Sequence, residues 1–259
     1  MPFVSPEIFA KQTIASVQEY SILSWRAIAN LFSRPRYWAD IYTQMDSIGV
    51  GSMPIVVLTG FFTGCVLALQ SATSLEAFGS VSLTGNLVAL SMVKELGPVL
   101  TGLMVSGRNA SGMASEIGSM KVTEQIDAMR ALGTAPVRKL VTPRVYATVF
   151  MLFFLTVVSD AVGIAGGALV SVTLMGLNAS SYFHNSYRAL QYGDVVQGLT
   201  KPLFSGFIIA TVGCFFGMTT KGGTQGVGKA TTQAVVYSSV FIIIVDFIVS
   251  RAMIGIFGR

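Results

Sequence analysis

Residues 47–75 read SIGVGSMPIVVLTGFFTGCVLALQSATSL and contain no Asp, Glu, Lys, Arg or His. About 20 consecutive apolar residues are enough for a helix to cross the hydrocarbon core of a bilayer. This stretch is long enough and apolar enough, so it predicts a transmembrane helix. Outward from it, four more stretches meet the same criterion, at residues 83–106, 145–175, 202–220 and 230–257.

The composition of the 259-residue chain also indicates a membrane protein. Hydrophobic residues make up 52% and charged residues 11%, and the mean hydropathy is +0.67. Soluble domains carry about 25% charged residues, so a soluble enzyme, a disordered chain and a secreted disulfide-rich scaffold are excluded. The apolar stretches are continuous rather than alternating, which favours helices over a β-barrel. The predicted fold class is an all-α integral membrane protein with five transmembrane helices.

The basic residues predict which side of the membrane each loop faces. The net charge is +5, and twelve of the 17 Lys and Arg residues lie before the first span, between the second and third, or between the fourth and fifth. Loops rich in Lys and Arg stay in the cytoplasm. We therefore interpret the positive charge as a topology signal rather than as a nucleic-acid-binding surface. The N-terminus is expected in the cytoplasm and the C-terminus on the outer side.

The segment before the first span, residues 5–33, is predicted to form an amphipathic helix in the cytoplasmic membrane interface. Ser5-Pro6-Glu7 supplies an N-cap, a proline at the first position and an acidic residue in the first turn. A largely apolar stripe follows at helical spacings of three and four, made of Ile14, Val17, Ser21, Trp25, Ile28 and Phe32. The alternative is a soluble helix that packs on another subunit.

Signals for chemistry within this chain are weak. Residues 223–230 (GTQGVGKA) approach the phosphate-binding loop G-x-x-x-x-G-K-[ST], but Ala230 replaces the hydroxyl residue that would hold Mg²⁺. His184 is the only histidine, so neither a histidine-based metal site nor a Ser-His-Asp triad can be assembled. Cys65 and Cys214 lie in apolar runs and are interpreted as buried small hydrophobic residues. We expect no cofactor, no metal and no ATP hydrolysis by this chain.

Two adjacent charged residues, Lys94 and Glu95, interrupt the second span just before Pro98. A charge in hydrocarbon costs about 2.5–3.5 kcal/mol on insertion scales, so such residues face a partner or a cavity. Pro98 removes a backbone hydrogen bond and predicts a kink. One interpretation is a polar spot that lines a substrate cavity, which Gln70 of the first span would share. The other is a buried ion pair with a further charged residue inside the spans, either Asp160, Asp246 or Arg251.

The longest basic loop contains a short predicted helix at residues 123–133. Thr123 is a suitable N-cap, Gly133 is a suitable C′ residue, and Pro136 follows. The charges suit the helix dipole, with acids in the first turn and a base near the end: Glu124, Asp127 and Arg130. An apolar side on a loop helix indicates a partner, and this helix carries Ile126, Met129 and Leu132. A membrane subunit with such a helix and no ATPase motif suggests an ABC permease, whose coupling helix binds a separate ATPase.

Long irregular motifs carry a specific resemblance. In the second span and the loop after it they are VKELGPV at 93–99, SGRNASG at 106–112 and EIGSMKVTEQ at 116–125. Towards the C-terminus they are GVGKATT at 226–232 and VDF at 245–247. Together these stretches resemble the signature of the MlaE/YrbE permease family, and the likeness covers nearly the whole chain as a single permease domain, residues 1–259.

This resemblance implies a homodimer in the bacterial inner membrane, with two cytoplasmic ABC ATPase subunits and a hexameric periplasmic MCE-domain protein as partners. It implies movement of phospholipid between the inner and outer membranes, which maintains the lipid asymmetry of the outer membrane. Carried onto matching positions, the lipid-binding residues are Leu67, Gln70, Leu75, Phe78, Lys94, Glu95 and Leu96. The residues that couple to the ATPase are Thr123, Glu124, Gln125, Asp127 and Arg130. Family members often have Arg in place of Lys94, which would add a fork-shaped donor.

Two other functions compete with this one. The charged residues inside spans, Lys94, Glu95, Asp160 and Asp246, are typical of an ion-coupled secondary transporter, which would work in an ion gradient without an ATPase. A structural anchor that docks periplasmic proteins would tolerate neutral substitutions at Lys94 and Glu95.

Overall fold

The computed structural model describes residues 6–31 and 37–257, and these residues form helices without any strand. The first helix, α1, runs over Pro6–Leu31. Two short helices lie outside the long ones, α7 at Gln125–Ala131 and α9 at Ala179–Ala189. Two of the long helices are single elements, α10 at Tyr192–Met218 and α11 at Gly223–Phe257.

The other long helices are runs of segments that differ in local winding. The first run consists of α2 (Trp38–Met45), the π-helical η1 (Asp46–Val50) and α3 (Gly51–Glu76). The second consists of η2 (Val81–Leu83), α4 (Thr84–Ser91), the π-helical η3 (Met92–Leu96), α5 (Gly97–Val105), the π-helical η4 (Ser106–Ala110) and α6 (Ser111–Val122). The third consists of the π-helical η5 (Val137–Val141) and α8 (Thr142–Thr173).

Five of these helical stretches are long and apolar enough to cross a membrane, which confirms the all-α membrane fold. They are Trp38–Glu76, Val81–Val122, Val137–Thr173, Tyr192–Met218 and Gly223–Ile256. The helices extend beyond the apolar stretches from which they were predicted. The second continues to residue 122 rather than 106, the fourth begins at residue 192 rather than 202, and the fifth begins at residue 223 rather than 230. The reason is that a helix satisfies its own backbone hydrogen bonds, so it need not end where its side chains become polar.

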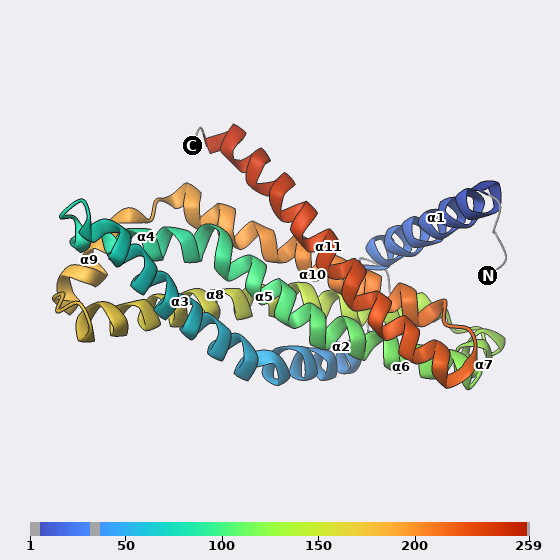
Figure 1. Cartoon of the computed structure of the whole chain (residues 1–259). Helices are drawn as coiled ribbons and strands as arrows, with labels where there is room; N and C mark the ends of the chain where they lie inside the picture. Colours follow the sequence, from blue (N-terminus) through green and yellow to red (C-terminus); the bar gives the residue numbers. More distant parts are fainter. Residues whose placement is uncertain (1–5, 32–36, 258–259) are drawn as a thin grey trace.

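The long helices lie side by side in an elongated bundle with two distinct ends (Figure 1). At one end, here called the α7 end, α7 lies near the turn between α10 and α11. At the opposite end, here called the α9 end, α9 lies near the turn between α3 and α4. The helix α1 projects from the bundle at an angle near the α7 end.

A close crossing of α3 and α8 holds the first and third long helices together. A Cβ atom on Gly64 would lie 1.8 Å from the carbonyl oxygen of Gly163, and one on Gly60 would lie 2.9 Å from that of Ser159. Between transmembrane helices, small residues allow the backbone contact that drives packing. The Cys65 thiol donates to the carbonyl oxygen of Gly166 at 3.3 Å, so this crossing also satisfies the cysteine.

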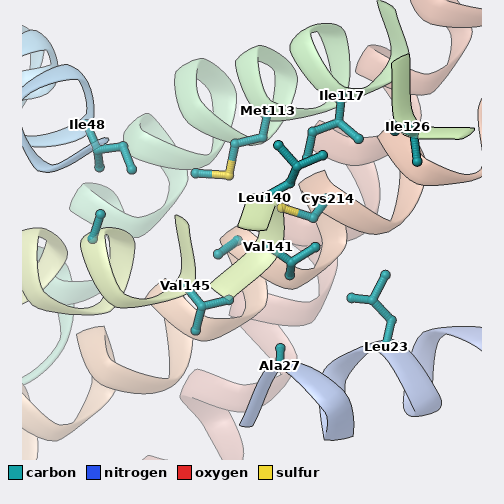
Figure 2. Packing of buried hydrophobic residues seen from close by; sticks show 12 residues of the cluster. Leu23, Ala27, Ile48, Met113, Ile117, Ile126, Leu140, Val141, Val145 and Cys214 are labelled. Carbon is teal, nitrogen blue, oxygen red and sulfur yellow. The ribbon is translucent and has the colours of Figure 1, made fainter. Parts of the chain in front are cut away.

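The largest buried apolar cluster lies towards the α7 end. Figure 2 shows Leu23 and Ala27 of α1 directed at side chains from the bundle, including Val141 and Cys214. Tyr20 of α1 adds a hydrogen bond between its hydroxyl and that of Thr211, at 3.0 Å. This side of α1 therefore attaches the helix to the bundle.

The apolar stripe predicted on α1 lies on a different side from these contacts. Ile14, Val17, Trp25 and Ile28 are all exposed, with Trp25 71% exposed. Ser5 and Phe32, which the sequence assigned to the N-cap and the stripe, lie outside the described residues. The stripe is thus free to meet lipid, as an interfacial helix requires.

The helix α9 was not predicted, because its segment is polar and was interpreted as a loop. The Asn178 side chain caps its start by accepting from the Ser180 backbone N–H at 2.8 Å. Ser186 donates to the Gly85 carbonyl at 3.1 Å, and Tyr182 donates to the Ile164 carbonyl at 3.3 Å. Burial raises the pKa of Tyr182 to about 12, so its hydroxyl stays a donor at neutral pH.

Candidate functional site

A hollow of about 350 Å³ opens on the bundle surface between α3 and η3, and it is called the groove below. Its lining is mostly apolar, with the Gln70 amide and the Thr63 hydroxyl as polar groups. The six lining residues are Phe62, Thr63, Val66, Leu67, Gln70 and Leu96.

Three of the seven predicted lipid-binding residues line this groove: Leu67, Gln70 and Leu96. The other four do not contribute to its lining. Leu75 lies in the last turn of α3, and Phe78 is exposed in the turn that follows. Lys94 and Glu95 precede Leu96 on η3 but their side chains are engaged elsewhere.

Lys94 and Glu95 bind the face of α10 rather than each other. The Lys94 ammonium pairs with Asp194 Oδ1 at 3.0 Å, and the Glu95 carboxylate pairs with Lys201. The Gln197 amide donates to Glu95 Oε1 at 3.2 Å. Asp194 also accepts from the Gln191 backbone N–H at 3.0 Å, which caps the start of α10.

The fifth long helix joins the same cluster, called the polar network below. Lys201 Nζ lies 3.1 Å from Asp246 Oδ1 on α11, and the Ser250 hydroxyl donates to Glu95 Oε1 at 3.2 Å. The Lys201 side chain is only 1% exposed, whereas Glu95 is half exposed. The polar network consists of Lys94, Glu95, Asp194, Gln197, Lys201, Asp246 and Ser250.

Lys94 and Glu95 do form ion pairs, but with Asp194 and Lys201 rather than with any of the three partners named from the sequence. Asp246 belongs to the network through Lys201, but Asp160 and Arg251 do not pair with Lys94 or Glu95. Asp160 is buried against α5, where a Cβ atom on Gly97 would lie 1.7 Å from its Oδ1. That Oδ1 atom has no hydrogen-bond partner among the described residues.

The α10 side of the network was not predicted, because the fourth span was expected to start at residue 202 and α10 starts at Tyr192. Asp194 and Lys201 were assigned to the loop and to the edge of the span. A signal was present, since Asp194, Gln197, Gly198 and Lys201 recur at helical spacings and so share one face. This face is the one that contacts η3.

A second candidate region is the elbow between α6 and α7, where the predicted N-cap was wrong. Thr123 ends α6 instead of starting the next helix, and its hydroxyl donates to the Ser119 carbonyl at 2.8 Å. The short helix begins at Gln125 rather than at residue 123. Between them, Glu124 turns the chain with φ 60° and ψ 9°. It is the one non-glycine residue with positive φ among the described residues.

The charges around this elbow are unevenly paired. Asp127 accepts from Lys121 at 2.7 Å and from Arg130 at 3.0 Å. The hydrogen bond from Lys121, with the neighbouring positive charge of Arg130, lowers the pKa of Asp127. Both nearby cations are thus used by Asp127, and Glu124 is exposed with no ion pair to any described residue.

The apolar side predicted for this helix divides into two parts. Ile126 is fully buried in the cluster of Figure 2, and Met129 packs against it. Leu132 is 83% exposed. Ile126 therefore attaches α7 to its own bundle, which corrects the expectation that the whole apolar side faces a partner. Gly133, with φ 75°, ends the helix as predicted, and the N–H of Thr134 reaches the Met129 carbonyl at 2.9 Å.

The glycine-rich stretch at residues 223–230 forms the first turns of α11. A phosphate-binding loop lies between a strand and a helix, and no strand occurs among the described residues. Within the same residues, no group of three His, Cys, Asp or Glu side chains is placed to hold a metal ion.

Comparison with known proteins identifies similar chains over most of this length. The family described as Permease MlaE matches residues 41–252. A probable ABC transporter permease of Rickettsia bellii is 42% identical over 236 residues, 91% of each chain. The intermembrane phospholipid transport system permease protein MlaE of Haemophilus influenzae is 35% identical over 221 residues, 85% of each chain. The chloroplastic protein TRIGALACTOSYLDIACYLGLYCEROL 1 of Arabidopsis thaliana is 36% identical over 229 residues, 88% of this chain and 65% of that protein.

Proposed function

This chain belongs to the MlaE permease family, and we propose that it is the membrane-spanning subunit of an ABC-type phospholipid transporter. The observation that carries this proposal is the match of the family to residues 41–252, together with the named phospholipid permease among its relatives. The five long apolar helices agree with a multi-pass protein of the inner membrane. The ion-coupled secondary transporter finds no support among these relatives.

The groove is the proposed lipid site. Its apolar walls suit acyl chains, and Gln70 offers a polar contact. In our proposal two copies of the chain form a homodimer in which the grooves contribute to one shared cavity. Leu75 and Phe78 lie further towards the α9 end. Lys94 and Glu95 directly precede Leu96 on η3, so the headgroup of a lipid in the groove would lie near these two charged residues.

The α7 end is the proposed cytoplasmic end, which follows from the Lys and Arg residues of its loops. The N-terminus would then lie in the cytoplasm and the C-terminus in the periplasm. An ABC ATPase would bind α7 and the elbow before it through exposed residues, which include Thr123, Glu124, Gln125, Asp127 and Arg130. A periplasmic MCE-domain protein would receive or deliver lipid at the α9 end, for transfer between the two membranes that maintains outer-membrane asymmetry.

The second long helix offers a direct mechanical route for this coupling. It runs from Val81 to Val122, so one helical run connects the elbow at α7 with Leu96 in the groove wall. Ile126 ties α7 to the buried cluster, so a force on α7 is passed to the bundle rather than absorbed by a loose loop. Closure of the ATPase pair would move these helices and narrow the cavity.

A photo-crosslinking experiment tests this function. Benzoylphenylalanine is placed at Leu67 in the groove or, as a control, at Val240, which is exposed on α11. After purification with the ATPase subunits, the Leu67 position should capture co-purified phospholipid, and ATP should reduce that capture. The Val240 position lies on the outside of a membrane span and should capture only surrounding lipid, with no response to ATP. The same response to ATP at both positions, or no effect of ATP at Leu67, would contradict the proposal.

A further inference from the structure

The π-helical segment η3 and the proline that follows it leave two backbone carbonyls of the second long helix without their usual donors. In an α-helix each carbonyl accepts from the N–H four residues later. The Gly97 N–H instead reaches back five residues to Met92, because η3 is π-helical, and this takes away the donor of Val93. Pro98 has no N–H, so Lys94 also loses its α-helical donor. In an apolar interior an unsatisfied carbonyl costs several kcal/mol.

The face of α10 meets both carbonyls. A Cβ atom on Gly198 would lie 2.0 Å from the Val93 carbonyl oxygen, so the two backbones are in contact there. One turn further along α10, Lys201 Nζ donates to the Lys94 carbonyl oxygen at 2.7 Å. The same ammonium binds Glu95 and lies 3.1 Å from Asp246. Lys201 thus joins the second, fourth and fifth long helices at one atom.

We propose that Lys201 is a positioning residue for the groove. Its ammonium takes the place of the backbone donor that Pro98 removes, and so it holds η3 in the π-helical form that places Leu96 in the groove wall. The importance of the groove for lipid rests on the proposed function, but the role of Lys201 in holding η3 does not.

The competing explanation is that Lys201 only neutralises the carboxylates of Glu95 and Asp246. The two explanations differ in what rescues the loss of Lys201. If the Lys94 carbonyl is what needs Lys201, then Pro98→Ala restores the missing N–H and should compensate for Lys201→Met. If charge alone matters, Pro98→Ala should not help, and neutralising both carboxylates should.

The test introduces Leu96→Cys in full-length protein with Cys65→Ala and Cys214→Ala, and measures how fast N-ethylmaleimide alkylates this thiol. Lys201→Met should change this rate at least fivefold, and adding Pro98→Ala should bring it back to within twofold of the parent. The matched control is Lys229→Met, an exposed lysine on α11, which should leave the rate unchanged.

An unchanged rate on adding Pro98→Ala would overturn the proposal. Restoration by Glu95→Gln with Asp246→Asn, instead of by Pro98→Ala, would also overturn it. If Lys201→Met is not recovered from the membrane, Pro98→Ala must restore its yield, and failure to do so counts against the proposal. The labelling needs no lipid transport, so a failure of the proposed function and a failure of this inference give different results.

Discussion

Two charged clusters, one centred on Lys201 and one on Asp127, each include a residue of the helical run Val81–Val122, but their central residues lie in very different surroundings. Both clusters pair one residue with two oppositely charged ones. The Lys201 side chain is 1% exposed, but the Asp127 side chain is 46% exposed. Exposed ion pairs contribute little to stability, whereas removal of one partner from a buried pair is strongly destabilising. The cluster around Lys201 therefore holds helices together. The cluster around Asp127 contributes little to stability, and it leaves Glu124 at the surface without an ion pair to any described residue.

The largest effect on the stability of the protein should come from separating α10 from η3 without changing any charge. Gly198→Ala would place a Cβ atom 2.0 Å from the Val93 carbonyl oxygen, so the two helices must move apart and strain the polar network. We expect a loss of about 3 kcal/mol, at the upper end for overpacking, measured as a lower midpoint of thermal unfolding in detergent. Gly228→Ala on α11, where nothing lies within 4 Å, is the control and should not lower the midpoint. Equal midpoints for the two variants would show that the contact with Val93 is not tight.

An intermediate effect is expected at the elbow, where Glu124 occupies a left-handed conformation. Glycine adopts this conformation freely, so Glu124→Gly should stabilise the protein by up to about 1 kcal/mol. The same change removes the unpaired carboxylate and should weaken binding of the ATPase by about tenfold, as loss of a charge-assisted hydrogen bond would. Stability is followed by thermal unfolding and binding by co-purification at increasing salt.

Glu124→Gln separates the two parts of this prediction. It keeps the strained backbone and the size of the side chain but removes the charge, so stability should stay unchanged while ATPase binding weakens. Tight binding by both variants would mean that the Glu124 carboxylate has no role at the interface.

The smallest effect is expected from titration of Asp127. Its pKa is lowered in the folded protein, so its contribution is complete above the unfolded value of about 3.9 and is lost as the pH falls through the lowered pKa. Because the group is exposed, acidification should increase hydrogen exchange only locally, at the backbone amides of residues 125–131. Asp127→Asn should show no such pH dependence in these amides. A pH response of the whole bundle in both proteins would assign the effect to another group.

The sequence was a good guide to the five spans, because a continuous apolar stretch is required of any helix in lipid. It was a poorer guide where helices continue through polar residues. Asp194 and Lys201 looked like loop residues, although their spacing places them on one helix face. Hydropathy averages over all sides of a helix, so it cannot reveal a polar face that packs on a neighbouring helix.

The prediction of the helix start at the elbow was wrong for a different reason. Thr123 suits the end of a helix as well as it suits an N-cap, because its hydroxyl can also donate to a carbonyl one turn back. The start of α7 at Gln125 depends on Glu124 in a conformation that its residue type disfavours. In the groove, Leu67, Gln70 and Leu96 were found through family resemblance, because a surface hollow between distant segments leaves no periodic signal.

The crossing of α3 and α8 has a consequence for biosynthesis. Cys65 and the Gly166 carbonyl that it contacts are 101 residues apart in the chain. At a synthesis rate of about 5–20 residues per second, roughly 5–20 s pass before the second partner is made. During this interval α8 has not yet been synthesised, so the glycine-lined surface of α3 has no helix to pack against. Nascent chains therefore depend on the insertion machinery or on surrounding lipid to cover this surface.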